Sequence, residues 1–295
     1  MKFEWTYEQE SPLMLRTFLK DQGISRGLLA KIKFQGGEIR VNDTVQNVLV
    51  YLTAGDHISV RIPDEGEHET LVPEHEPLDI VFEDEHFLVV NKPSGVASIP
   101  AQYHPNGTMA HRVKGYYVRQ GYVNQIVHVV TRLDRDTTGL MLFAKHGYAH
   151  AMMDKQLQAR TIHKYYQALV SNIHAKQLSG DGDILLPIMR DETSIIKRKT
   201  GQEGLFAHTE YHVLQEDERF SLVMIQLHTG RTHQIRVHFS AIGHPLLGDD
   251  MYGGRMDVGM ERQALHCAKL VFNHPFTKEN IELEQALPRD MQQLL

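Results

Sequence analysis

Cysteine is almost absent from this chain of 295 residues, because Cys267 is the only one. An intramolecular disulfide is therefore excluded, as is a zinc site built from paired cysteines. No apolar run approaches the roughly 20 residues of a membrane span. The first residues (MKFEW) also lack the apolar core of a signal peptide. We therefore expect a cytoplasmic protein with no membrane partner.

Positive charge is also in short supply, since the formal net charge is −6. Taken alone, this value argues against a nucleic-acid partner. The charge is unevenly spread, however. Residues 64–76 hold six acidic side chains and no Lys or Arg, whereas residues 13–40 hold six Lys or Arg against two Asp or Glu. Because local charge decides whether a phosphate backbone is attracted, the net value does not exclude RNA.

The pattern of apolar and turn-forming residues divides the chain into three parts. Residues 1–62 predict a small α+β domain, with a helix from Leu13 to Leu19, a second helix capped by Ser25, and strands at 38–42 and 57–62. Residues 63–77 are acidic and bounded by prolines, which predicts an extended, mobile linker. Residues 78–295 contain many short strands and few helices. This favours an α+β domain with mostly antiparallel strands over alternating βαβ units.

A polar loop at residues 131–139 (TRLDRDTTG) holds the first candidate for chemistry. Asp134 and Asp136 lie there beside Arg132 and Arg135. A carboxylate next to guanidinium groups stays ionised, which suits a nucleophile or an abstracting base better than a general acid. The alternative is a structural ion pair. On these residues alone the two aspartates have equal claims.

A second candidate lies in residues 227–243, which follow a predicted strand at 222–227. Thr232 is expected to cap a helix that ends at Gly243. Arg236 then lies in the first or second turn and Arg231 in the preceding loop. A helix N-terminus with two arginines favours an anion, either a substrate phosphate or the carboxylate of Asp134. The alternative is that both arginines are surface residues without a role.

The 19 histidines do not form a metal-binding pattern. His228, His233 and His238 are five residues apart, so no two share a helical face. His266 and Cys267 are neighbours in a predicted strand and should point to opposite faces. We therefore expect a metal-free protein.

These segments resemble the signature motifs of the RluA-type RNA pseudouridine synthases. The match covers residues 131–139, 164–170 (KYYQALV) and 227–238 (LHTGRTHQIRVH), and extends through 83–95, 243–253 and 263–275. The resemblance implies an α+β catalytic fold with a mostly antiparallel mixed sheet and a central cleft. It also implies an isomerase that needs no cofactor, because uracil is both the leaving group and the acceptor.

The resemblance also implies roles for individual residues. The family's catalytic aspartate follows Arg-Leu, which selects Asp134 over Asp136. Tyr166 corresponds to the tyrosine that stacks on the flipped base, and Arg236 to the arginine that holds the catalytic carboxylate. Arg132 is expected to fill the gap left in the RNA, and Arg231 to lie near the RNA backbone or to support its loop.

One position departs from the family pattern. Thr131 stands where many members carry His. This residue is not the nucleophile, so we expect altered loop packing or RNA context and no loss of activity.

Residues 1–62 resemble the small RNA-binding domain of the ribosomal-protein S-four type. The match lies in residues 15–19, 23–26, 29–32, 36–42 and 52–60. It implies that exposed bases on the two helices contact a phosphate backbone: Arg16, Lys20, Arg26, Lys31 and Lys33. The alternative is that they form a solvated helix face.

We therefore expect a monomeric RNA pseudouridine synthase acting on structured RNA, chiefly large-subunit ribosomal RNA, with transfer RNA left open. Whether Asp134 attacks the sugar or removes a proton to give a glycal also stays open. One alternative is a catalytically silent RNA-binding or ribosome-assembly protein. Another is a glycosidic hydrolase, which would need a second carboxylate. Asp249 is the outside candidate for that role.

Overall fold

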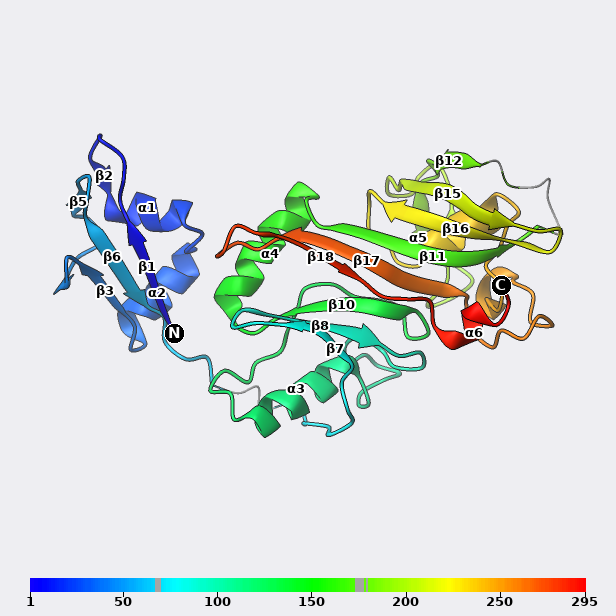
Figure 1. Cartoon of the computed structure of the whole chain (residues 1–295), viewed down its shortest axis with the longest axis horizontal. Coiled ribbons are helices and arrows are strands. Elements are labelled where there is room, and N and C mark those ends of the chain that lie inside the picture. The colour runs from blue at the N-terminus through cyan, green and yellow to red at the C-terminus, as the bar shows by residue number, and fades with distance from the viewer. Residues whose placement is uncertain (67–69, 173–177, 179) are drawn as a thin grey trace.

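The computed structural model describes residues 1–66, 70–172, 178 and 180–295. Its N-terminal segment folds around a second core, to which Tyr148 of the larger body also contributes. Figure 1 shows this segment at one end of the molecule. A sheet of order β1-β6-β3-β4 packs against two helices, and a short pair of strands, β2 and β5, closes one end. The elements are β1 (Lys2–Thr6), β2 (Leu13–Met14), α1 (Leu15–Asp21), α2 (Arg26–Phe34), β3 (Glu38–Val41), β4 (Thr44–Val45), β5 (Tyr51–Leu52) and β6 (His57–Arg61).

Both predicted helices of this segment are confirmed. The Ser25 side chain caps α2 by accepting a hydrogen bond from the backbone N–H of Leu28. β1 was not predicted, although its alternation of exposed and half-buried residues is typical of a strand with one face on a core. Phe3 and Trp5 point inward there and pack against the core.

The larger sheet carries the rest of the fold. Among the described residues it contains ten strands, and β10–β17 is its one parallel pair. Its main path runs β12-β15-β16-β11-β17-β10-β8-β7, with β18 beside β17 and β9 beside β10. The strands are β7 (Ile80–Glu83), β8 (Phe87–Lys92), β9 (His128–Val129), β10 (Thr138–Ala144), β11 (His163–Ser171), β12 (Asp181–Ile184), β15 (Thr209–Glu216), β16 (Phe220–Leu227), β17 (Leu265–Asn273) and β18 (Asn280–Glu284). The expected mostly antiparallel mixed sheet is confirmed.

The remaining elements surround this sheet (Figure 1). Near the N-terminal segment lies α4 (Gly147–Ala159), whereas α3 (Met109–Gln120) lies beside β7 and β8. At the other end, α5 (Gln234–Ala241) contacts β15 and also β14 (Arg198–Thr200), which forms a two-stranded hairpin with β13 (Ile188–Arg190). The 3-10 helix η1 (Asp250–Tyr252) follows α5, and α6 (Arg289–Gln292) lies near the C-terminus.

Aromatic and histidine rings join the N-terminal segment to the larger body. The Phe3 ring lies edge-on to Tyr148 at 4.9 Å between centroids and at 5.3 Å from Phe276. The Tyr148 hydroxyl donates a hydrogen bond of 2.6 Å to the carbonyl of Gln22. These contacts seat the turn between α1 and α2 against α4.

Two acidic residues in the described part of the linker form hydrogen bonds with the larger body. The Glu65 carboxylate pairs with His128 and accepts a hydrogen bond from the N–H of Gly147. Further along, the Glu74 carboxylate accepts a hydrogen bond from the N–H of Gly107. Two acids of the segment predicted to be an extended, mobile linker thus contact the larger body. None of the described helices is long and apolar enough to cross a bilayer.

The predicted start of α5 is also wrong by one residue. His233, not Thr232, is the N-cap, and it adopts a left-handed conformation with φ of 56°. The cause is Gln234, whose side chain folds back to accept hydrogen bonds from the Arg231 N–H and the Thr229 hydroxyl. The predicted end is confirmed, since Gly243 follows the helix with a positive φ.

Candidate active site

A cavity of about 100 Å³ opens where the loop before β10, the ends of β11 and β16, and the N-terminus of α5 meet. All five catalytic-domain residues singled out from the sequence line it: Asp134, Tyr166, Arg236, Arg132 and Arg231. They come from positions up to about a hundred residues apart in the chain. The fold therefore gathers them into one site.

The backbone around Asp134 is held from both sides. The Thr131 hydroxyl accepts a hydrogen bond from the Leu142 N–H, so this residue anchors the loop to β10. The Ser98 hydroxyl donates to the Leu133 carbonyl and accepts from its N–H. This accounts for Thr131 at a position where His was expected, because the side chain serves the loop backbone and lies outside the cavity lining.

A buried lysine supports the same loop from beneath. The Lys92 ammonium donates hydrogen bonds of 2.6 to 2.7 Å to the carbonyls of Pro93, Val96 and Arg135. Burial lowers the pKa of Lys92 to about 7, although the negative charges of Asp136 and Asp134 act to raise it. Three carbonyl acceptors match the three donors of an ammonium, so Lys92 ties two loops together beside the cavity.

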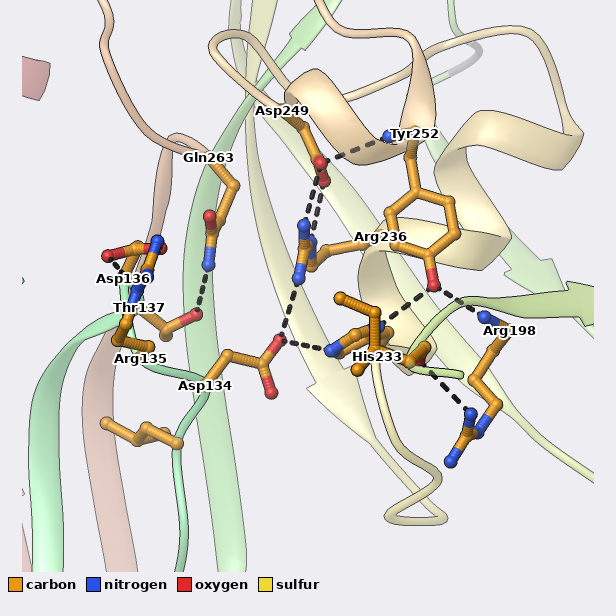
Figure 2. A network of polar contacts seen from close by, with 12 residues as sticks. Asp134, Arg135, Asp136, Thr137, Arg198, His233, Arg236, Asp249, Tyr252 and Gln263 are labelled. Atoms are coloured by element: carbon orange, nitrogen blue, oxygen red, sulfur yellow. Dashed lines mark hydrogen bonds and ion pairs between the residues drawn. The ribbon is translucent and has the colours of Figure 1, made fainter. Parts of the chain in front are cut away.

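Arg236 connects the Asp134 carboxylate to a second, wholly buried carboxylate (Figure 2). Its Nε and Nη2 donate hydrogen bonds of 2.7 and 2.8 Å to the two oxygens of Asp249. Its Nη1 lies 3.4 Å from Oδ2 of Asp134. Burial opposes the Arg236 charge, but the hydrogen bonds and charge of Asp249 raise the pKa of Arg236 above its ordinary value. Arg236 is thus a fixed cation aimed at Asp134.

His233 and Tyr252 complete the polar network around Asp134 (Figure 2). Nε2 of His233 lies 3.9 Å from Oδ2 of Asp134, and its Nδ1 lies 2.9 Å from the Tyr252 hydroxyl. That hydroxyl also accepts a hydrogen bond from the backbone N–H of Arg198 on β14. Burial lowers the pKa of His233, although the negative charge of Asp134 acts to raise it. Burial therefore favours the neutral imidazole.

Sequence reasoning missed His233 and Tyr252 and assigned Asp249 no supporting role. All three lie inside the segments matched to the family, at 227–238 and 243–253. The available signal was the Gly-Asp-x-x-Tyr-Gly stretch at 248–253, because an aspartate followed by a turn is a good cap. Asp249 does cap η1, accepting a hydrogen bond from the Tyr252 N–H.

Tyr166 forms part of the cavity wall with only 4% of its surface exposed. Burial, followed by the neighbouring Cys267 and Asp134, raises the pKa of Tyr166 well above its ordinary value. The phenol is therefore protonated at neutral pH. Lys164, two residues earlier on β11, also lines the cavity, and burial lowers its pKa. The sequence had not singled out Lys164 as a site residue.

The structure distinguishes the two aspartates of the loop. The Asp136 carboxylate forms hydrogen bonds with Nε and Nη2 of Arg135 and does not line the cavity. Arg132 is exposed at the cavity wall. The Arg231 guanidinium donates to the carbonyl of Phe206, so this arginine supports a neighbouring loop.

The five basic residues predicted on the N-terminal helices lie outside this cavity. Their side chains are exposed on α1 and α2: Arg16, Lys20, Arg26, Lys31 and Lys33. Within the described ranges, no group of three or more His, Cys, Asp or Glu side chains is arranged to hold a metal ion.

Comparisons with known proteins agree with this arrangement. The family model for RNA pseudouridylate synthase matches residues 86–241. An uncharacterized RNA pseudouridine synthase of Bacillus subtilis, YjbO, is 43% identical over 284 residues, covering 96% of this chain and 98% of that protein. Ribosomal large subunit pseudouridine synthase D of Pseudomonas aeruginosa is 36% identical over 272 residues, covering 88% and 83%.

A solved structure shares the fold as well. Human RNA pseudouridylate synthase domain containing 1 superimposes with a TM-score of 0.59 at 26% identity, covering 72% of this chain and 84% of that one. Family model, relatives and fold converge on the segment that builds the cavity. The chain accordingly belongs to the RNA pseudouridine synthases of the RluA and RluD type, and it is an isomerase of uridine in RNA.

Proposed function

We propose that this enzyme isomerises specific uridines of large-subunit ribosomal RNA in the cytoplasm, with Asp134 as its catalytic residue. The observation that carries this proposal is the position of the Asp134 carboxylate. It lies in the cavity 3.4 Å from the buried guanidinium of Arg236, on a loop fixed by side-chain hydrogen bonds. The ribosomal substrate is proposed because pseudouridine synthases D of the ribosomal large subunit are among the chain's relatives.

The reaction conserves every atom of the nucleotide. The bond from N1 of uracil to C1′ of the ribose breaks, the base turns, and a bond from C5 to C1′ forms. C5 loses a proton and N1 gains one. Asp134 starts this sequence either by attacking C1′ or by removing the proton at C2′, and its position beside Arg236 serves both routes. Arg236 orients the carboxylate through its contact with Oδ2.

The flipped nucleotide is received by the other residues of the cavity. The Tyr166 ring offers a flat apolar face for stacking, and its protonated hydroxyl is not available as a base. Arg132, exposed beside Asp134, enters the space that the uridine leaves in the RNA. Extrusion of the base costs a few kcal/mol, which contacts of this kind offset.

The N-terminal segment is proposed to bind structured RNA in the manner of the S-four type domain. Its exposed cations on α1 and α2 include Lys33, whose ammonium lies 5.3 Å from the centre of the exposed Phe34 ring. A cation beside an exposed aromatic ring is a common arrangement on RNA-binding surfaces.

The hydrolase alternative is disfavoured by Asp249. A glycosidase needs a second carboxylate that is free to act on the bond or on water. Both oxygens of Asp249 are engaged by Arg236, and the side chain is wholly buried. The residue therefore positions Arg236 and is not available as an acid or base.

The test is a map of pseudouridine across total RNA from cells lacking the gene, restored with wild type or with Asp134→Asn. We expect one or more ribosomal sites to vanish and to return only with wild type. Asp136→Asn is the matched control, since Asp136 faces Arg135 and lies outside the cavity lining. It should restore the sites. Restoration of growth by Asp134→Asn without restoration of any site would favour the silent RNA-binding protein instead.

A further inference from the structure

A second cavity, of about 420 Å³, lies beside the catalytic one. Its walls are the β13–β14 hairpin on one side and α5 with Tyr252 on the other. The volume falls within the range of about 300 to 1,000 Å³ typical of small-molecule sites. No role in the reaction described above is assigned to it. The residues around it indicate what it could bind.

The hairpin presents cations to this cavity. Lys197, Arg198 and Lys199 line it, against one acid, Asp191. One oxygen of Asp191 is already engaged by the N–H and hydroxyl of Thr193. The cavity lining therefore carries a net positive charge, which favours an anionic ligand.

The arginines of the hairpin donate hydrogen bonds to its backbone carbonyls, whereas Lys197 and Lys199 do not. The Arg198 guanidinium donates to the carbonyls of Ile196 and Lys197, and Arg190 lies 3.5 Å from the carbonyl of Ile195. In the part of the chain that the structure describes, neither Lys197 nor Lys199 has an ion-pair partner within 4 Å. Both lysines interact electrostatically with Asp191, but neither ammonium forms a salt bridge with a described residue, so both can donate to a ligand.

Tyr252 joins this cavity to the catalytic network. Its ring lies 5.0 Å from the Arg236 guanidinium and 5.6 Å from the Lys197 ammonium, measured to the ring centre. Its hydroxyl contacts His233 and the N–H of Arg198 (Figure 2). A ligand in the second cavity would therefore be separated from the residues around Asp134 by a single side chain.

We propose that the second cavity binds a nucleotide that neighbours the target uridine in the substrate strand, with its phosphate held by Lys197 and Lys199. The remaining wall, from Thr200, Ser240 and Ala241, offers hydroxyls and a small apolar surface to the ribose and base. This inference rests on the proposed function, because an enzyme acting inside an RNA strand always meets the flanking nucleotides. The lysines then act as specificity-determining residues that contribute binding energy away from the reacting atoms.

The test compares the double variant Lys197→Gln/Lys199→Gln with wild type on a ribosomal RNA fragment containing a mapped site. Lys269→Gln/Lys278→Gln, on the β17–β18 hairpin, is the matched control because it removes the same charge elsewhere. We expect KM and the dissociation constant to rise about tenfold and kcat to stay within about threefold. The slope of log affinity against log salt should fall by about 1 to 2, as for one or two lost phosphate contacts.

A second readout locates the nucleotide. RNA carrying 4-thiouridine on either side of the target should cross-link to the peptide containing residues 190–200, and 10 mM uridine monophosphate should not compete. The inference would be overturned if Lys197→Gln/Lys199→Gln gave the same KM, salt slope and cross-link as the control variant. Full competition by uridine monophosphate would also overturn it. Wild type that binds RNA but forms no pseudouridine would instead overturn the proposed function, since binding and cross-linking still report on the cavity.

Discussion

At the residue scale, the site depends on one guanidinium shared unequally between two carboxylates. Asp249 takes the two short hydrogen bonds of Arg236, and Asp134 receives the longer contact. The stronger pair is buried and fixes the cation, whereas Asp134 remains half-buried and open to the cavity. This division places a cation beside the Asp134 carboxylate, and Arg236 contacts only one of its two oxygens.

Replacing Asp249 by Asn should therefore harm both stability and catalysis. Breaking one partner of a buried ion pair leaves an uncompensated charge, and we expect a loss of about 3 to 5 kcal/mol in the free energy of unfolding. The surviving folded enzyme should show a lower kcat, because Arg236 would turn toward Asp134. Urea unfolding and single-turnover kinetics measure the two effects.

The control for this change is Asp257→Asn. Asp257 forms a similar two-point pair with Arg255, but the pair is exposed. Exposed pairs contribute little to stability, so this variant should unfold close to wild type and keep its activity. Equal losses in the two variants would contradict the role given to burial.

Residue identity near Asp134 shows what sequence can and cannot predict. Motif resemblance was enough to group Asp134, Tyr166 and Arg236 in one site, and they line the same cavity. The partnership of Arg236 with Asp249 did not, because two buried groups 13 residues apart meet only once α5 and η1 are packed. An isolated arginine and an isolated aspartate carry no pairwise signal in the chain.

At the element scale, α4 begins on a buried histidine. Nδ1 of His146 accepts a hydrogen bond from the Ala149 N–H, so the ring proton lies on Nε2, 3.0 Å from Nδ1 of His86. Burial, followed by the neighbouring His86, lowers the pKa of His146 to about 3. The cap therefore works only with the neutral ring.

Because of His146, acid should lower the free energy of unfolding in a defined pH range. The unfolded chain binds a proton at His146 below about pH 6.5, whereas the folded chain does so only near pH 3. Between these values the unfolded state holds more protons, so stability falls as pH falls, by up to about 1.4 kcal/mol per pH unit. We expect His146→Asn, which still caps a helix but does not titrate, to lose less stability between pH 6.5 and pH 4.5.

Urea unfolding at several pH values tests this prediction. At pH 8 the wild-type histidine is neutral in both states, so the difference between the two proteins there reports capping and packing alone. A pH dependence of the variant identical to that of wild type would show that His146 does not carry the effect.

Elements were easier to predict than their ends. Apolar periodicity predicted a strand at 222–227, within a few residues of β16 (Phe220–Leu227), because a buried strand has few other solutions. The first residue of α5 was misplaced because the Gln234 side chain competes for the Arg231 N–H and forces His233 into the left-handed region. Such local competition depends on geometry that periodicity does not contain.

At the scale of the whole molecule, RNA is expected to meet the protein at two separate places. The exposed cations of α1 and α2 belong to the N-terminal segment, whereas the cavity that Asp134 lines lies among elements of the larger sheet. The aromatic contacts of Phe3 with Tyr148 and Phe276 hold the two parts together. Affinity and chemistry should therefore separate by mutation.

The triple variant Arg16→Gln/Lys20→Gln/Arg26→Gln should weaken RNA binding without changing the chemical step. We expect the slope of log affinity against log salt to fall by about 2 to 3. The single-turnover rate constant at saturating RNA should stay within about twofold of wild type. Filter binding from 50 to 300 mM salt measures the slope.

A matched variant removes three cations that already have acidic partners or local carbonyl contacts: Arg219, Lys269 and Lys278. It should bind RNA as wild type does. Equal weakening in both triple variants would mean that net charge alone, and not the N-terminal surface, governs affinity.

The parallel pairing of β10 with β17 has a consequence for the timing of synthesis. Thr138 and Gly139, which directly follow the Asp134 loop, align with His266 and Cys267, and the Thr138 hydroxyl lies 2.8 Å from Nδ1 of His266. Ribosomes add about 5 to 20 residues per second, so these partners are made on the order of 6 to 25 seconds apart. Until Cys267 emerges from the ribosome, one side of the Asp134 loop has no strand to rest on. A nascent chain thus carries the side chains of Asp134, Tyr166 and Arg236 well before the cavity that they line is complete.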